Sequence, residues 1–156
     1  EAYHQVMNAL NKESGLKALG NTNMMQDLRK RAQEGDVISE LAISIYAYRT
    51  AKYIGAYWST LPYCNALIFT AGVGENEGYV REKILHFLGN LKVEIDEDKN
   101  NKRKQEMIIG KSSINPSAPM HIMVIPTDEE IVIGYDALYL GFLKQPLPKM
   151  YPFETD

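Results

Sequence analysis

Two short apolar runs, each followed at once by a polar turn, constrain the fold of this chain most strongly. Residues 65–70 (Asn-Ala-Leu-Ile-Phe-Thr) lead into the turn at 71–76, and residues 121–125 (His-Ile-Met-Val-Ile) lead into 126–130. Short continuous apolar runs between turn signals are typical of strands that are covered on both faces. Helix patterns follow both turns, so the sequence predicts an α/β domain in which helices cover a small sheet.

Helical spacing of apolar residues dominates the first half of the chain. The segments with this spacing are residues 3–10, 25–33 and 37–61. Asp36 is a suitable N-cap for the long third segment, and Pro62 ends it. This segment carries few charges and is apolar nearly all round, which is typical of a buried helix.

The second half alternates between strand and helix patterns. Residues 92–95 alternate like a strand, and the highly charged residues 96–104 are expected to form a solvated turn or helix face. The last stretch, 145–156, holds three prolines and is expected to extend over the surface. We therefore expect one domain over residues 1–144 and an extended tail over 145–156.

Composition and charge exclude several classes of protein. The 156 residues, 45% of them hydrophobic, suit one domain with a packed core. A net charge of −3 gives no general attraction to nucleic acid or to anionic lipid. The single cysteine, Cys64, excludes an internal disulfide and a cysteine-rich zinc site. No apolar run approaches the roughly 20 residues of a membrane span, so we expect a cytoplasmic protein without nucleic-acid or membrane partners.

The turn after the first apolar run has the composition of a ligand site. Gly72 and Gly74 allow positive φ and let a ligand approach the backbone. The helix that follows presents unpaired N–H groups to a phosphate, and Asn76 can cap this helix or bind a polar ligand edge. A tight strand-to-helix turn that uses glycine only for geometry explains the same residues, since a lone Gly-x-Gly is a weak signal.

The turn after the second apolar run is rich in carboxylates. Thr127 and Glu130 have the Thr-x-x-Glu spacing of a capping box, which leaves Asp128 and Glu129 exposed at the N-terminal end of the helix. Carboxylates there gain about 0.3–1 kcal/mol from the helix dipole, so a structural role is sufficient to explain them. The alternative is a magnesium site, in which one or two carboxylates hold a hydrated ion that also touches a nucleotide phosphate.

A dinucleotide-binding oxidoreductase is a further class that the first turn allows. Gly72-x-Gly74 follows a strand, and Glu94 or Asp96 lies about 20 residues on, where such enzymes bind the ribose. Against this class, Glu77 occupies the third glycine position of the fingerprint, and about 60 residues of largely helical chain precede the strand.

Several segments, in the same order along the chain, resemble the C-terminal half of the acetate kinase family. These segments are Asn-Lys-Glu-Ser-Gly at 11–15, Tyr-Arg-Thr-Ala-Lys-Tyr-Ile-Gly-Ala-Tyr at 48–57, Ala-Leu-Ile-Phe-Thr-Ala-Gly-Val-Gly-Glu-Asn at 66–76, Val-Arg at 80–81 and Ile-Pro-Thr-Asp-Glu-Glu at 125–130. The resemblance implies an actin-like ATPase (ribonuclease H-like) fold. It also implies a homodimeric kinase that transfers the γ-phosphoryl group of ATP to acetate, reversibly and with magnesium.

The resemblance implies roles for individual residues as well. The residues that would line the adenosine pocket are Gly72, Val73, Gly74, Glu75 and Asn76. Glu129 would hold the magnesium ion through water. A glycine turn and a carboxylate-bound ion suit phosphoryl transfer, which relies on positioning and charge neutralisation.

One segment departs from the family pattern. After Gly20 the family usually carries Ser-Ser-Asp-x-Arg-Asp, whose Asp and Arg lie near the nucleotide. Aligned without gaps, Met24 replaces this Asp and Gln26 replaces this Arg; a shift of three residues would instead use Asp27 and Arg29. We prefer the gap-free alignment. Loss of the guanidinium removes bidentate phosphate recognition, so we expect impaired activity or a changed phosphate donor. The alternative function is a non-catalytic nucleotide-binding or dimerisation module.

The chain starts at Glu1, without a Met and already in a helical pattern, which predicts a piece of a longer protein. In the family, the first phosphate loop, the acyl-phosphate pocket and the catalytic Arg and His belong to the N-terminal half. We therefore expect no catalytic residue in this chain and no turnover by the chain alone. The missing N-terminal domain is its expected partner.

Overall fold

The chain forms two compact units in a computed structural model that describes residues 2–152. The first unit ends at Pro126, and the second begins at Thr127. The division into a domain over residues 1–144 and a tail over residues 145–156 stays a prediction.

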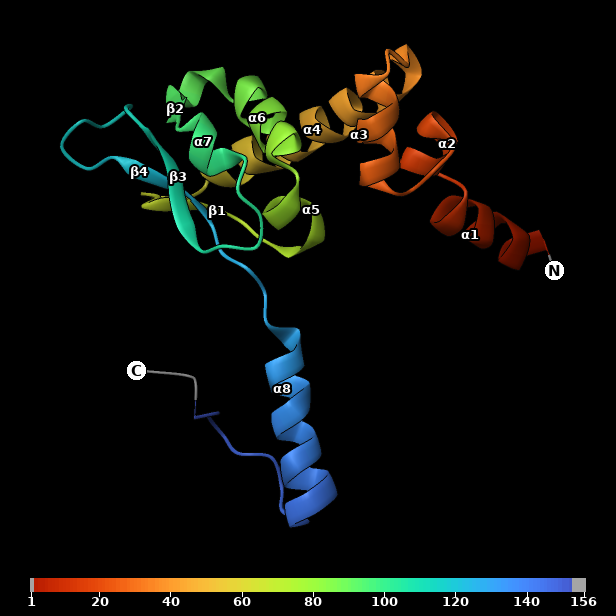
Figure 1. The fold of residues 1–156 in the computed structure, drawn as a ribbon, viewed down its shortest axis with the longest axis vertical. Coiled ribbons are helices and arrows are strands. Elements are labelled where there is room, and N and C mark those ends of the chain that lie inside the picture. The colour runs from red at the N-terminus through yellow and green to blue at the C-terminus, as the bar shows by residue number, and fades with distance from the viewer. Residues whose placement is uncertain (1, 153–156) are drawn as a thin grey trace. The chain divides into compact units, whose positions relative to one another are not determined.

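Helices form the N-terminal part of the first unit (Figure 1). They are α1 (Ala2–Lys12), α2 (Leu16–Gly20), α3 (Met25–Gln33) and α4 (Val37–Trp58). Asp36 is the N-cap of α4 as predicted, because its carboxylate accepts a hydrogen bond from the Ile38 N–H at 3.0 Å. The Ser39 hydroxyl donates to the same carboxylate at 2.6 Å, and this bond lowers the pKa of Asp36.

The prediction that the long helix is buried nearly all round is wrong for the described residues. The side chains that α4 buries form one stripe, made of Ser39, Ala42, Ile43, Ala47 and Ala51. On its other faces Leu41 is 54%, Tyr53 59% and Tyr57 68% exposed. The apolar composition shows that α4 has more than one apolar face, but it does not show what covers each face.

A four-stranded sheet completes the first unit. Its strands are β1 (Ala66–Phe69), β2 (Val93–Ile95), β3 (Met107–Ser112) and β4 (Met120–Val124). They lie in the order β1-β4-β3-β2, with β1 parallel to β4 and with β3 antiparallel to both of its neighbours. Short elements connect them: α5 (Ala71–Asn76), α6 (Gly78–Phe87), the 3-10 helix η1 (Gly89–Leu91) and α7 (Glu97–Asn100).

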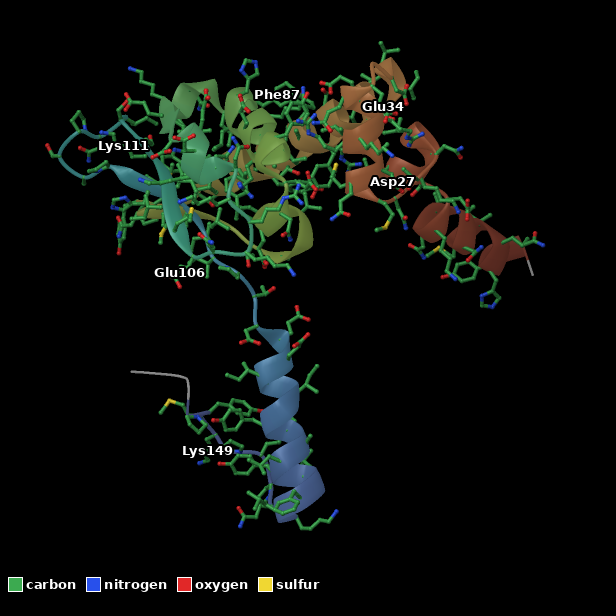
Figure 2. The ribbon with its side chains drawn as sticks, viewed as in Figure 1. Asp27, Glu34, Phe87, Glu106, Lys111 and Lys149 are labelled. Carbon is green, nitrogen blue, oxygen red and sulfur yellow. The ribbon has the colours of Figure 1, made fainter. Side chains whose placement is uncertain are left out.

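One face of the sheet belongs to the core of the first unit. The core joins Ile109, Ile122 and Val124 of the sheet to Leu28, Ile43 and Val80 of the helices. The other face is more open, because Ile68 is 48% and Ile108 46% exposed. Exposed Lys111 lies on β3 (Figure 2). The expectation that β1 is covered on both faces is therefore wrong for the described residues.

The second unit consists of one long helical segment and the chain that follows it. α8 (Glu129–Asp136) continues into the π-helix η2 (Ala137–Leu143), which confirms that a helix follows the second turn. Beyond it, the Tyr151 hydroxyl donates to the Asp136 carboxylate, and the Tyr151 and Tyr135 rings meet edge to face, 6.1 Å apart. Residues 153–156 of the predicted tail lie outside the described residues. None of the helices described is long and apolar enough to cross a membrane.

Candidate functional site

The predicted nucleotide turn, Gly72–Asn76, folds as the short helix α5 directly after β1. Neither Gly72 nor Gly74 has a positive φ, which corrects the expected use of these glycines; Ala71 is left-handed instead, with a φ of 59°. Gly74 is closely packed, since a Cβ there would lie 3.2 Å from the Phe69 carbonyl carbon and would require a small shift of the backbone. At Gly72 nothing lies within 4 Å of such a Cβ, so the backbone is open to an approaching ligand.

The side chains of this turn differ in their surroundings. Val73 and Gly74 line a hollow of about 270 Å³, together with Thr50 of α4. Glu75 is buried, with 7% of its surface exposed. The Asn76 amide donates to the Gly72 carbonyl at 2.8 Å, so it closes α5 and does not cap the next helix as expected. The structure therefore brings Val73 and Gly74 to the hollow and uses Asn76 within the turn.

Arg81, the fourth residue of α6, binds the backbone of the glycine turn. The residue is 1% exposed, and its Nη1 donates to the Gly74 carbonyl at 2.7 Å. Its Nε donates to the Asn100 Oδ1 at 2.9 Å, and its Nη2 donates to the Asn100 carbonyl. Burial lowers the pKa of Arg81, and the nearby Glu77 carboxylate acts in the opposite direction. Sequence reasoning matched Arg81 to a family motif but gave it no role, and Asn100 carried no signal.

The segment that departs from the family pattern forms the start of α3. Met24 is the N-cap residue of α3, makes no side-chain cap bond and is 55% exposed. Gln26 is exposed in the first turn. Arg29 instead reaches α6, where its guanidinium carbon lies 3.9 Å from the centroid of the Tyr79 ring. Met24 and Gln26 as nucleotide-binding residues stay a prediction.

The Tyr79 ring belongs to a polar cluster that joins α3, α4 and α6. The Tyr79 hydroxyl donates to the Glu40 carboxylate at 2.8 and 2.9 Å, and Lys83 Nζ lies 2.6 Å from Glu40 Oε1. Partial burial acts to raise the pKa of Glu40, but the hydrogen bonds from Lys83 and Tyr79 outweigh it and lower this pKa. The cluster thus fixes α3 against the helix that follows the glycine turn.

Glu129, the predicted magnesium residue, begins α8 in the second unit. The Asp128 carboxylate caps α8, because it accepts from the Ile131 N–H at 3.2 Å. The expected box between Thr127 and Glu130 stays a prediction. Glu129 itself is exposed. Over residues 2–152, no group of three or more His, Cys, Asp and Glu side chains is arranged to hold a metal ion. That Glu129 and the glycine turn bind the same magnesium–nucleotide complex stays a prediction.

The chain is similar to known kinases in sequence and in fold. The model of the acetokinase family matches residues 1–135. An acetate kinase from Pseudothermotoga lettingae is 44% identical over 133 residues, which are 85% of this chain and 32% of that protein. A solved propionate kinase from Francisella tularensis matches with a TM-score of 0.73 and 36% identity, over 83% of this chain and 32% of its own. An acetate kinase structure from Porphyromonas gingivalis gives 0.72 and 30%, over 85% and 33%.

The fold class that the sequence predicts is confirmed: the chain is an α/β domain of the actin-like ATPase type, with its glycine turn after a parallel strand. More narrowly, the chain belongs to the acetokinase family. This membership excludes the dinucleotide-binding oxidoreductase. The chain spans about a third of the length of the curated relatives it matches.

Proposed function

We propose that this chain is the nucleotide-binding part of an acetate kinase. In this reaction the γ-phosphoryl group of ATP passes reversibly to acetate and gives ADP and acetyl phosphate. The observation that carries the proposal is the turn after β1, where Val73 and Gly74 line a hollow and Arg81 holds the Gly74 carbonyl. Family membership and the acetate kinase relative at 44% identity support the same activity.

ATP and magnesium are the cofactors of this proposal. Residues 72–76 would bind the adenosine part of the nucleotide, and Glu129 would hold the ion through water. Magnesium keeps several waters and takes one or two carboxylates besides substrate phosphates, so an exposed carboxylate such as Glu129 suits it. When bound, the ion neutralises charge on the phosphates, while this chain binds and orients the nucleotide.

The proposal extends to the partners of the chain. We infer a homodimer in the cytoplasm, completed by an N-terminal domain that supplies the acetate pocket and the catalytic groups. Exposed apolar side chains on α4, among them Leu41, Tyr53 and Tyr57, support an interface there. The chain alone is expected to turn over nothing, since those catalytic groups lie outside it.

A magnesium titration of the full-length protein tests the role of Glu129. In a Glu129→Gln variant we expect the Mg²⁺ concentration for half-maximal activity to rise about tenfold, because the ion loses a charged acceptor for its waters. Glu130→Gln is the matched control, since it removes the same charge from the next residue and is expected to leave this concentration unchanged. An equal shift in both variants would assign the effect to the general charge of the helix end.

A non-catalytic module is the second candidate, and the Met24 and Gln26 replacements favour it. Calorimetric titration of the full-length protein with Mg-ATP separates the two candidates. Binding together with acetyl phosphate formation supports the kinase. Binding without turnover supports a nucleotide-binding module, and the absence of binding supports a module for dimerisation.

A further inference from the structure

Asn100 is a buried amide in an otherwise charged and exposed segment. It is the last residue of α7 and only 5% exposed, whereas Glu97, Asp98 and Asn101 around it are exposed. The sequence predicted a solvated turn or helix face here. A buried amide needs hydrogen-bond partners, because its desolvation otherwise costs free energy.

The partners of Asn100 come from α6. Its side-chain Oδ1 and its backbone carbonyl both accept from Arg81, and its Nδ2 donates to the Gly78 carbonyl at 3.0 Å. A Cβ on Gly78 would lie 2.5 Å from the Asn100 carbonyl oxygen, so the start of α6 and the end of α7 meet backbone to backbone. Two bonds to one planar guanidinium fix the orientation of that group.

The remaining arm of the guanidinium reaches the candidate nucleotide turn. Arg81 Nη1 donates to the Gly74 carbonyl at 2.7 Å, and both Gly74 and Arg81 line the hollow beside the turn. Asn100 itself does not line this hollow. Arg81 therefore connects Asn100 to this hollow.

A competing partner for Arg81 lies close by. The Glu77 carboxylate acts to raise the pKa of Arg81. The Oε1 atom of Glu77 is buried without a hydrogen-bond partner among the described residues. Without Asn100, the Arg81 Nε would lose its acceptor in a buried site. The guanidinium would then keep only the Asn100 backbone carbonyl as an acceptor on that side, so its orientation toward the Gly74 carbonyl would be held less firmly.

We propose that Asn100 is a positioning residue for nucleotide binding, which acts through Arg81 to hold the Gly72–Asn76 turn in place. This inference rests on the proposed function of the turn. The short helix α7, which carries Asn100, thus belongs to the site, although it lies far from the glycine motif in the sequence.

Steady-state kinetics of the full-length protein test the proposal. In Asn100→Ala we expect the KM for ATP to rise about tenfold and the KM for acetate to change less than about twofold. Asn100→Asp keeps an acceptor for the Arg81 Nε but places a carboxylate oxygen against the Gly78 carbonyl, so its ATP value is expected to lie between those of wild type and of Asn100→Ala. The control is Asn101→Ala at the exposed neighbouring position, which should match wild type. Parallel rises in both KM values, or no rescue by Asn100→Asp, would overturn the proposal.

Amide hydrogen exchange gives a readout that does not depend on activity. In the nucleotide-free full-length protein, exchange at residues 72–76 should be about tenfold faster in Asn100→Ala, with exchange in β4 unchanged. Unchanged exchange at the turn would contradict the proposal even if the kinase is active. If the wild type binds no ATP, the proposed function fails, and the exchange rates still show whether Asn100 holds the turn.

Discussion

Replacing Gly110 by alanine is expected to lower the free energy of unfolding of the chain by about 3 kcal/mol. A Cβ at this position of β3 would lie 2.4 Å from the backbone oxygen of Glu94 and 3.2 Å from the Cα of Ile95. Both atoms belong to the backbone of β2, so they cannot rotate away as the end of a side chain does. The clash is relieved only if β2 moves off β3, and the sheet then loses its pairing at this edge.

Urea unfolding of Gly110→Ala and of Gly89→Ala measures the effect against a matched control. Nothing lies within 4 Å of a Cβ at Gly89, and its φ is not positive. The same added methyl group should therefore change the free energy of unfolding by less than about 0.5 kcal/mol there. Equal stability of the two variants would show that β2 shifts without loss and that its pairing contributes little.

Gly110 also explains why β3 could not be predicted. The pairing of β3 with β4 has a register irregularity between Ile108 and Gly110, so exposed and buried positions do not alternate regularly along the strand. β1 and β4, by contrast, are continuous apolar runs that end at turns, and these features are visible in the sequence. Patterns of period two identify regular strands and miss those that depend on a bulge.

Burial was harder to predict than secondary structure. The cap at Asp36 and the bounds of α3 follow from local chemistry, and the structure confirms them. The exposure of Leu41 and Tyr57 depends on which other parts of the protein pack against α4, which no local pattern contains.

The candidate site divides in the same way. The sequence indicates the glycine turn because Gly72 and Gly74 come directly after an apolar run. Residues so near in sequence to the end of a strand also lie near it in space. The contact of Arg81 with Asn100 joins residues 19 positions apart, across η1 and β2. Asn100 was assigned to a solvated segment because its neighbours are charged, and only the tertiary structure shows that it is buried.

Restoring the family's Asp and Arg at the start of α3 is expected to raise the kcat for acetyl phosphate formation in the full-length protein. For the double variant Met24→Asp with Gln26→Arg we expect an increase of about 100-fold, since a guanidinium that neutralises transferring phosphoryl groups contributes this much or more. Glutamine offers a neutral amide in place of a charged, planar pair of donors. Initial rates at saturating Mg-ATP and acetate measure the gain.

We expect the fold to tolerate both changes, so that a gain in rate can be separated from a gain in stability. Met24 and Gln26 are exposed, and an Asp at the N-cap of α3 should itself add about 1 kcal/mol to stability, which thermal unfolding of the single variant measures. Gln33→Arg, at the other end of α3, adds the same charge at an exposed position and should leave kcat unchanged. A wild type that already reaches the rate of the double variant, and loses it in Arg29→Ala, would reject the gap-free alignment. The guanidinium stacked on Tyr79 would then be the family's arginine, shifted by three residues.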